Sequence, residues 1–599
     1  MKKKSWLLMM GFWLALFIAV FTYCQLFLSF NYPFVEQFTF FRFSGEYASS
    51  TLNEPGGVAT YIASFLSQFY LYPAVGPLIS AVLVVLCTAL LDLSLKKISS
   101  RYYIPFLSAL PALACVWLET DFNYYLSGTV SLVLSMVVFW LYVKARALGS
   151  VWVRTVLLML ASWTFYYALG PNALLMVGLC VIAELNKADK RSWLSVLALP
   201  VAMACPIMLY HMGIGEELQF QLLPTGYYVV LLPAGMLCFL PWFASILNVV
   251  VAKVSSFFQV SADGEQLPRL NRIFLSVWMV ALQLVAVVAV MHWGVQQFSS
   301  SKNYEAKIFD YYSRTGQWMN LLTDSHLRPH QNFMHTCYQN LALSSLNLMG
   351  DKMFACPQMG YPGLFIKWNK TVNSSTLLND VYWQAGDVAL AQEMAFEGMI
   401  ASRDGVNPRL LMRLLQTNLV CGNYPVAEKY INLLSDTYSY AEQAEKYRKM
   451  LYKDEAVLAD PELGPRKRAM KAGGLTTTEL TAKDLELIVD NNPEFVPAMH
   501  YFGGLCLVVK DIPTFINFIE KHHKSPVLDS MPVHFQEAIV IAYENTPDRW
   551  KELGVTSQVI QRYEEYRKAF ITHRGSPMLA RKMAVGFQDT FWYHFMFRK

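Results

Sequence analysis

The first residues that could do chemistry are three glutamates in one polar segment between apolar runs. Glu36, Glu46 and Glu54 all lie within residues 31–73, which leave one long apolar run and enter the next. A carboxylate in this setting can accept the proton of an attacking hydroxyl group. We therefore expect residues 31–73 to form a reactive or binding surface.

A second polar segment, residues 119–124, carries two acids at close spacing. Side chains two residues apart in an extended loop project to the same side, which would bring the carboxylates of Glu119 and Asp121 together. Carboxylate oxygens are the ligands that Mg²⁺ and Mn²⁺ prefer. The pattern predicts a divalent metal site, with the alternative that charged residues simply end an apolar helix at water.

A third polar segment, residues 211–226, contains His211 and Glu216, which we predict to be auxiliary binding groups. A single histidine beside a helix end is more often an interfacial residue than a ligand. The sequence has no metalloprotease, Cys-x-x-Cys, phosphate-loop or Gly-x-Ser-x-Gly motif, which leaves zinc proteolysis, nucleotide-driven chemistry and serine hydrolysis without support. A net charge of +5 without a basic, aromatic-interleaved cluster argues against nucleic acid as a partner.

Composition indicates the kind of scaffold that must position these side chains. The 599 residues are 54% hydrophobic and only 16% charged, which is typical of a membrane protein. Residues 1–298 hold 16 Lys or Arg and 12 Asp or Glu, whereas residues 299–599 hold 33 and 32. We therefore predict a transmembrane bundle in residues 1–298, followed by a region of ordinary soluble composition.

Nine apolar runs are near the ~20 residues needed to cross a bilayer core. They are Trp6 to Phe30, Ala74 to Leu95, Tyr102 to Leu118, Tyr125 to Val143, Val151 to Leu169, Asn172 to Leu185, Trp193 to Tyr210, Tyr227 to Val251 and Ile273 to Gln297. The fifth and sixth runs are separated only by residues 170–172 and could instead form a re-entrant hairpin. The pattern predicts an all-α, polytopic helix bundle with about nine spans.

The distribution of Lys and Arg predicts the orientation of this bundle. Fifteen of these residues lie at one set of helix ends, and only Arg42 lies at the other. Because basic residues resist translocation, the N-terminus is predicted to be cytoplasmic. An odd number of spans then places residues 299–599 in the periplasm, and the three acidic segments on the same outer face of an inner-membrane protein.

A helix is predicted to follow Glu54, since Pro55, Gly56 and Gly57 form a breaker cluster. Apolar residues then recur at helical spacing at Val58, Tyr61, Ile62, Phe65, Leu66, Phe69 and Tyr70. The opposite face carries Thr60, Ser64, Ser67 and Gln68. The pattern predicts an amphipathic helix lying in the membrane interface, with packing across the bundle as the alternative.

Few ionisable residues fall within the apolar runs, which argues against an ion or proton translocator. Asp92 and Glu184 lie near predicted cytoplasmic helix ends, where we expect water to reach them. Gln283 and His292 are predicted to form hydrogen bonds between helices.

These features together resemble the GT-C class of membrane glycosyltransferases. The shared features are a lysine-led first span, a long acidic first outer loop with a helix after Pro55 and Gly56, a short acidic loop after the third span, and a soluble region after the last. The resemblance covers residues 1 to about 300. The whole chain also resembles uncharacterised membrane proteins of Bacteroides-type bacteria.

The GT-C resemblance implies a polyprenyl-phosphate-linked sugar donor, a carboxylate of the first loop as base and a metal held by acids of the outer loops. Its first-loop acid would correspond to Glu36, Glu46 or Glu54, and its second-loop pair to Glu119 with Asp121. The sequence departs from the class because its first loop has no Asp-x-Asp or Asp-Glu pair.

Beyond residue 298 the sequence predicts repeated helical hairpins. Gly316, Gly350, Gly386 and Gly422 are spaced by 34, 36 and 36 residues, as in tetratricopeptide-like (TPR-like) repeats. We assign TPR-like repeats to residues 299–460 and further helical hairpins to residues 461–599. A breaker region from Asp460 to Gly474 is predicted to divide them.

Four of the ten cysteines lie in this outer region, where an oxidising compartment would let them pair. Cys337 and Cys356 are the nearest two in sequence, whereas Cys421 and Cys506 have the pattern of helix-core positions.

Two functions follow from the sequence. One is a GT-C-like transferase acting on the outer face with a polyprenyl-phosphate sugar. The other is a non-enzymatic, membrane-anchored TPR-like scaffold for envelope protein assembly, whose partners are envelope proteins and membrane lipids.

Overall fold

The computed structural model describes residues 2–99, 104–121, 124–146, 150–185, 190–214, 238–261, 277–327, 332–402, 405–470 and 480–598. All regular secondary structure in these ranges is helical, which confirms the predicted all-α fold. The chain divides into two compact units. Unit 1 comprises Met1–Tyr304 with Asp436–Ser439, and unit 2 comprises Glu305–Ser435 with Tyr440–Lys599.

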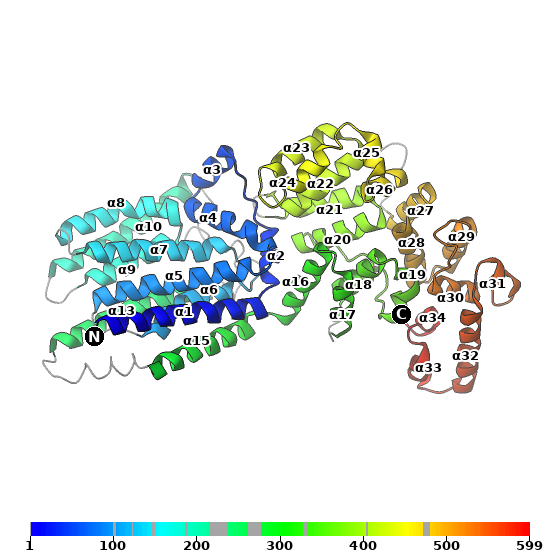
Figure 1. Cartoon of the computed structure of the whole chain (residues 1–599), viewed down its shortest axis with the longest axis horizontal. Helices are drawn as coiled ribbons and strands as arrows, with labels where there is room; N and C mark the ends of the chain where they lie inside the picture. Colours follow the sequence, from blue (N-terminus) through cyan, green and yellow to red (C-terminus); the bar gives the residue numbers. More distant parts are fainter. Residues whose placement is uncertain are drawn as a thin grey trace. The chain divides into compact units, whose positions relative to one another are not determined.

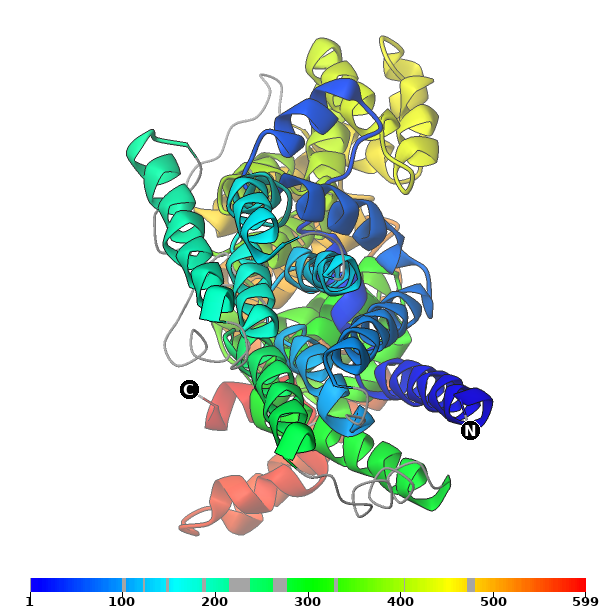
Figure 2. The ribbon, with the colours of Figure 1, turned by 90° about the vertical axis from the view of Figure 1, so that its left-hand side faces the viewer.

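Unit 1 is a bundle of long apolar helices with shorter helices at one end (Figure 1). Its helices are α1 (Lys2–Phe27), α2 (Asn31–Glu36), α3 (Gly45–Leu52), α4 (Gly57–Ser67), η1 (Gln68–Leu71), α5 (Val75–Ile98), α6 (Pro105–Leu118), α7 (Leu126–Ala145), α8 (Val151–Leu169), α9 (Asn172–Glu184), η2 (Lys190–Leu197), α10 (Ala198–His211), α13 (Leu240–Ser261) and α15 (Val277–Phe298). Figure 2 views these helices from the end of the bundle.

Each of the nine predicted apolar runs contains a helix within its described part. Five of the described helices are long and apolar enough to cross a membrane: Trp6–Phe27, Val75–Ile98, Leu126–Ala145, Lys190–His211 and Trp278–Phe298. Helices α6, α9 and the apolar part of α13 are shorter. The predicted eighth run ends too early, because α13 continues to Ser261, and residues 227–237 of that run lie outside the described residues.

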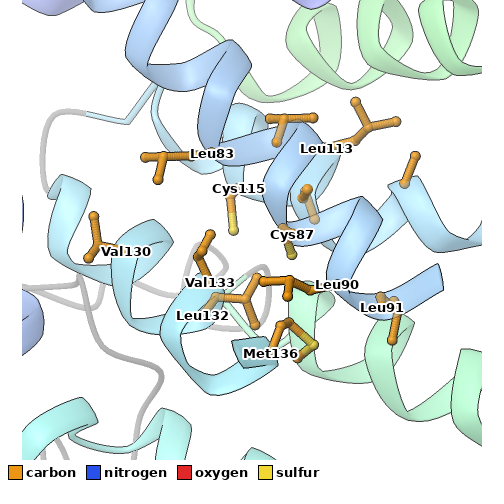
Figure 3. Close-up of a cluster of buried hydrophobic side chains, with 14 of the residues drawn as sticks. Leu83, Cys87, Leu90, Leu91, Leu113, Cys115, Val130, Leu132, Val133 and Met136 are labelled. Carbon is orange, nitrogen blue, oxygen red and sulfur yellow. The ribbon is translucent and has the colours of Figure 1, made fainter. Parts of the chain in front are cut away.

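The core of unit 1 lies where α5 packs against α1, α6 and α7. Figure 3 shows side chains from three of these helices meeting there, with Cys87 and Leu90 from α5, Cys115 from α6, and Val133 and Met136 from α7. All five are at most 9% exposed. In a bilayer such side chains stabilise the bundle through close packing, because lipid tails are as apolar as the side chains that they would replace.

Polar groups inside the bundle join helices to one another. The backbone N–H of Phe106 in α6 donates to Gln283 Oε1 in α15 over 3.2 Å, and the Tyr23 hydroxyl of α1 lies 3.2 Å from His292 Nδ1. The predicted inter-helix role of Gln283 and His292 is confirmed. These bonds fix the positions of α1, α6 and α15 because an apolar surrounding makes an unpaired polar group costly.

The expected access of water to Asp92 and Glu184 is wrong. Both residues are only 2% exposed, since neighbouring helices cover the ends of α5 and α9. Trp13 of α1 donates its indole N–H to Asp92 over 3.0 Å. Arg154 of α8 donates to both carboxylate oxygens of Glu184 over 3.0 Å each.

The turn between α8 and α9 is tight, with Gly170 at a φ of 64°. The two helices pack against each other, and Asn172, at the start of α9, is buried. Its side chain donates to Ser131 Oγ of α7 over 3.0 Å and accepts from the indole of Trp242 in α13 over 2.6 Å. One amide side chain therefore connects three helices at this end of the bundle.

Helix α4 forms as predicted after the breaker cluster, and its face toward the rest of the protein carries small residues. Ala59, Ala63 and Ser67, one helical turn apart, are buried, whereas Val58 and Phe65 are each 37% exposed. The small side chains let α4 lie close against α7 and α8. The face that carries the small residues is thus the packed one, because close approach of two helices favours small residues over large apolar ones.

Unit 2 consists of short helices connected by tight turns. They are α16 (Ser301–Arg314), which begins in unit 1, α17 (Trp318–Leu327), α18 (Phe333–Ser345), α19 (Met349–Lys352), η3 (Met353–Ala355), η4 (Tyr361–Gly363), α20 (Val372–Ala385), α21 (Val388–Ile400), α22 (Pro408–Cys421), α23 (Tyr424–Ser435), α24 (Ala441–Arg448), α25 (Asp454–Ala459), α26 (Leu463–Ala469), α27 (Thr481–Asn491), α28 (Val496–Val508), α29 (Ile512–His522), α30 (Val533–Ala542), α31 (Asp548–Glu552), α32 (Ser557–His573), α33 (Leu579–Phe587) and α34 (Phe591–Phe597).

Three of the four spaced glycines lie just after the end of a helix. Gly316, Gly386 and Gly422 have φ values of 68°, 90° and 77°, which glycine adopts without steric cost. Gly350 instead lies inside α19, where an added Cβ would meet the Pro532 ring at 2.6 Å. The question of pairing among the four outer cysteines is answered by the structure, in which all ten cysteines are free thiols.

The predicted breaker region from Asp460 to Gly474 is wrong over its first half. Residues Leu463–Ala469 form α26, which packs against α22, and residues 471–479 lie outside the described residues. Arg466 is 5% exposed, and its guanidinium lies 4.3 Å from the ring centroid of Trp383. Arg466, Lys467 and Arg468 therefore lie on a packed helix rather than in a solvated loop. Stacking of Arg466 on the buried ring of Trp383 helps to hold this helix in place.

Candidate functional site

A narrow cavity lies in unit 1 where the first loop meets the turn between α6 and α7. It is lined by Leu28, Asn31, Tyr32, Val35, Tyr70, Glu119, Tyr124 and Leu126. The volume open to the centre of a water molecule is about 20 Å³, which is room for one or two waters. A single hydroxyl group of a larger molecule needs the same space.

Two tyrosines from the first loop form one wall of this cavity. Tyr32 of α2 and Tyr70 of η1 are 4% and 3% exposed, and their rings meet edge to face at 5.1 Å. Gly76 of α5 makes this packing possible, because an added Cβ would lie 2.3 Å from the Tyr32 ring. Burial raises the pKa of both hydroxyls well above the usual value, so both stay protonated and can donate.

Glu119 is the one carboxylate that lines the cavity among the described residues. It is the C-terminal cap of α6, and its backbone N–H donates to the carbonyl of Cys115 over 2.9 Å. Ser80 of α5 donates to Oε2 over 2.9 Å, and Thr129 of α7 donates to Oε1 over 3.2 Å. Three helices thus hold the carboxyl group in one orientation.

The surroundings of Glu119 place its proton equilibrium near neutral pH. Burial disfavours the charged form and raises the pKa of Glu119 to about 7, while the hydrogen bonds from Ser80 and Thr129 act in the opposite direction. A carboxyl group with a pKa near the working pH can both take and return a proton. Glu119 is therefore suited to general acid or base chemistry.

The three predicted catalytic glutamates do not line this cavity. Glu36 is the last residue of α2 and is 1% exposed. Glu46 lies in the first turn of α3, Glu54 lies between α3 and α4, and both are exposed. The first loop contributes to the cavity through Asn31, Tyr32, Val35 and Tyr70 instead.

The geometric premise for pairing Glu119 with Asp121 is wrong. The chain does not run extended there, because Glu119 has helical φ and ψ values of −61° and −13°. The N–H groups of Thr120 and Asp121 donate to the carbonyls of Trp117 and Leu118 over 3.2 and 2.9 Å, which closes a tight turn. Asp121 is half-buried and is absent from the cavity lining.

His211, from the third polar segment, does not line the cavity. His211 is exposed at the end of α10, with its ring 5.6 Å from that of Tyr210. Glu216 lies outside the described residues.

The side chains around Glu119 do not fit a divalent ion as they stand. Both of its oxygens accept hydrogen bonds from hydroxyl groups. Within the part of the chain that the structure describes, no group of three His, Cys, Asp or Glu side chains is arranged to hold a metal ion. A magnesium site needs several oxygen ligands around one point.

The sequence prediction missed the hydroxyl groups that hold Glu119. Ser80 and Thr129 have the pattern of ordinary members of apolar helices, and Tyr70 belongs to the predicted interfacial apolar face. A signal was present, since a buried polar side chain in an apolar helix needs a partner. That signal does not say which partner, because Ser80 and Glu119 are 39 residues apart in sequence.

Comparison with known proteins gives a family for the chain. No curated protein and no solved structure matches it significantly. The profile of a protein family matches residues 4–598, which includes both units and every residue that lines the cavity. The chain therefore belongs to the Family of unknown function (DUF6057).

Proposed function

We propose that this protein is an integral membrane glycosyltransferase of the cell envelope, with Glu119 as the base that activates the acceptor. The observation that carries the proposal is a carboxyl group with a pKa of about 7, held by two hydroxyl donors in a cavity that admits one hydroxyl group. The resemblance of the first 300 or so residues to the GT-C class supplies the reaction type. A polyprenyl-phosphate-linked sugar is the proposed donor.

The proposed reaction is a displacement at the anomeric carbon of the donor sugar. Glu119 takes the proton of the acceptor hydroxyl, and the acceptor oxygen forms the new glycosidic bond. The bond between the anomeric carbon and the donor phosphate breaks, and the phosphate oxygen leaves with the bonding electrons. The protonated hydroxyls of Tyr32 and Tyr70 line the same space and donate hydrogen bonds to the acceptor oxygen, which orients it toward Glu119.

This mechanism assigns a different base from the first-loop glutamates. Glu36 is buried away from the cavity lining, and Glu46 and Glu54 face solvent, so none of them is positioned at the hydroxyl-sized space. No step is assigned to a metal ion, since the groups around Glu119 are hydrogen-bond donors.

The proposed location is the inner membrane, with the N-terminus in the cytoplasm, the cavity on the outer face and unit 2 in the periplasm. Five helices long and apolar enough to cross a membrane support membrane insertion. The excess of Lys and Arg at the opposite helix ends supports the orientation.

Deletion of the gene, followed by complementation, tests the proposal. We expect loss of an envelope glycan or glycoprotein on deletion and rescue by the wild-type chain but not by Glu119→Gln, which keeps the shape of the side chain. Glu54→Gln, an exposed acid of the same outer face, is the matched control and should rescue. Rescue by Glu119→Gln at wild-type level and with wild-type protein abundance would refute the mechanism.

A second candidate function is a membrane-anchored scaffold with TPR-like repeats, which the hairpins of unit 2 favour. Helices α20 with α21 and α22 with α23 form consecutive hairpins, and Ala391 and Ala427 are fully buried where the helices meet. Such arrays present a surface to other proteins. Here Ile400→Glu, at a side chain 76% exposed on α21, should reduce cross-linking to envelope proteins, while Glu119→Gln should rescue fully.

A further inference from the structure

Helices α32 and α33 of unit 2 form a hairpin with one packed face and one exposed face (Figure 1). The ring of Tyr566 in α32 is buried and lies 5.4 Å from that of Phe587 in α33 and 5.6 Å from that of Trp592 in α34. Arg562 of α32 donates to the carbonyl of Gly586 in α33 over 3.2 Å. These contacts fix which side of each helix faces solvent.

The exposed side of α32 combines an apolar side chain with basic ones. Ile571 is 66% exposed, and Lys568 and Arg574, three residues before and after it, are exposed as well. Side chains three residues apart are neighbours on the surface of a helix. Ile571 therefore lies in solvent with a cation on either side of it.

Helix α33 repeats this combination. Met578, Arg581, Lys582 and Val585 are all exposed, and their spacing is that of one face of a helix. The chain leaves the helical conformation at Val585, and the next residue, Gly586, has a φ of 95°. This turn presents Val585 at the surface, where its side chain is 80% exposed.

The exposed residues of the hairpin form what we call the basic-apolar face. Its members are Lys568, Ile571, Arg574, Met578, Arg581, Lys582 and Val585. The chain segment that contains them, residues 566–588, has five Lys or Arg and no Asp or Glu.

The acids around the hairpin leave the four cations of this face without ion pairs. Asp589 is paired with Arg562 at 2.8 Å, and Glu544 lies 3.5 Å from Arg567, which is not part of the face. The glutamates at positions 564–565 precede the basic segment on α32. Within the part of the chain that the structure describes, no cation of the basic-apolar face lies within ion-pair distance of a carboxylate. The face therefore has a net positive charge in contact with solvent.

The composition of the face favours a bilayer over a protein as its partner. The core of a protein interface is depleted of Lys and enriched in aromatic anchors, whereas here four cations separate three non-aromatic apolar side chains. A layer of anionic headgroups suits this pattern, because phosphates attract the cations and the acyl boundary accepts the apolar side chains. In the proposed membrane location, the apolar helices also keep the hairpin tethered near lipid, which raises its effective concentration there.

We infer that the basic-apolar face of α32 and α33 docks on the surface of an anionic lipid bilayer. Arg574, Arg581 and Lys582 contact the lipid phosphates, and Val585 inserts at the boundary between headgroups and acyl chains. This membrane contact is separate from the Glu119 cavity, and it does not rest on the transferase proposal.

Binding of vesicles to the full-length protein tests this inference. The protein is held in nanodiscs of phosphatidylcholine, and co-flotation with vesicles of phosphatidylglycerol or of phosphatidylcholine is measured. We expect binding to the phosphatidylglycerol vesicles only. Replacing two cations together, Arg581→Gln with Lys582→Gln, should weaken this binding about thirtyfold. Val585→Ser should weaken it about tenfold, because less apolar surface leaves water on docking.

The matched control removes two exposed cations from another hairpin of unit 2. Lys429→Gln in α23 with Lys449→Gln, just after α24, should bind as the wild type does. Equal losses in the two double variants would overturn the inference, since they would show a response to net charge alone.

Three other results would also overturn the inference. They are equal binding of the two kinds of vesicle, unchanged binding by the Val585→Ser protein, and binding of a soluble polyglutamate peptide as tight as that of the anionic vesicles. The peptide result would favour an acidic protein partner, which needs no bilayer. Loss of an envelope glycan bears on the transferase proposal and leaves this inference unaffected.

Discussion

Glu119 of unit 1 and the pair of Asp310 and Asp380 in unit 2 have different kinds of partner. In unit 1, Glu119 is held by the hydroxyls of Ser80 and Thr129, and burial raises its pKa to about 7. In unit 2, Asp310 and Asp380 lie 2.7 and 2.5 Å from the two terminal nitrogens of Arg409. A carboxylate paired with a guanidinium keeps its charge and holds helices together, whereas one held by neutral donors can exchange a proton.

The influence of paired charges is also seen in the pKa of Arg409. Burial acts to lower the pKa of Arg409, but the nearby Asp310 and Asp380 outweigh it and raise the pKa above the usual value. These three groups, with Arg413 also 3.3 Å from Asp380, form a cluster of charges that bridges α16, α20 and α22. These buried acids of unit 2 therefore serve the structure, whereas Glu119 of unit 1 is a buried acid held by neutral donors.

The largest expected effect is the loss of stability when Arg409 is removed from its cluster with Asp310 and Asp380. Arg409→Met should destabilise the protein by about 3–5 kcal/mol, because it leaves Asp310 without its guanidinium and Asp380 with only the 3.3 Å contact to Arg413. Denaturant unfolding of the full-length protein, followed by tryptophan fluorescence, measures the change. Arg549→Met is the control, since its pairs with Glu520 and Glu552 are exposed and should be worth less than about 1 kcal/mol. Equal losses for the two variants would contradict the comparison.

The next largest effect is on the stability of a Glu119→Gln variant. Above neutral pH this substitution should stabilise the protein, whereas Arg409→Met destabilises it. The folded pKa of Glu119, about 7, lies above the reference value of 4.5, so the folded protein binds more protons between these values and loses stability as pH rises through them. The loss reaches about 3 kcal/mol above pH 7. Glu119→Gln should flatten this dependence and be more stable than the wild type at pH 8, while it loses activity. Parallel stability curves against pH for the two proteins would show that Glu119 is not buried as a neutral acid.

A smaller effect tests the tyrosine wall of the cavity. Gly76→Ala places a Cβ 2.3 Å from the Tyr32 ring and should cost about 1–3 kcal/mol, with a loss of activity as Tyr32 moves. Gly178→Ala in α9 is the matched control, because an added Cβ there meets nothing within 4 Å. It should be neutral or stabilise by up to about 1 kcal/mol. Thermal unfolding and activity of both variants are compared with the wild type, and a stable, fully active Gly76→Ala protein would contradict the assigned packing.

The smallest expected effect is a shift in the pH dependence of activity when Ser80 is replaced. Ser80→Ala removes a hydrogen bond that lowers the pKa of Glu119, so the pKa should rise above its present value of about 7. A hydrogen bond worth about 1 kcal/mol moves the midpoint of a base-dependent activity toward alkaline pH by less than about one pH unit. Ser94→Ala is the control, because that hydroxyl of α5 bonds to the carbonyl of Leu90 in its own helix. An unmoved midpoint for Ser80→Ala would remove Glu119 from the role of base.

The amino-acid sequence by itself determined the all-α class, the helical nature of the nine apolar runs within the described residues, and the bridging roles of Gln283 and His292. These features depend on local periodicity and on the cost of an unpaired polar group, both of which can be read along the chain. The sequence also singled out Glu119 as a residue for chemistry. It assigned that residue to a metal site, because two acids at close spacing fit that pattern as well.

Only the tertiary structure decided which acid lines the cavity and which face of α4 is buried. Glu119 gains its raised pKa from burial by α2, η1 and α7 and its orientation from Ser80 and Thr129, none of which is its neighbour in sequence. Ala59 and Ser67 are buried where α4 packs closely against α7, whereas Phe65 is 37% exposed. The burial of a carboxylate and the identity of its hydrogen-bond partners depend on how helices pack in three dimensions. These two properties distinguish a reactive carboxylate from a structural or solvated one.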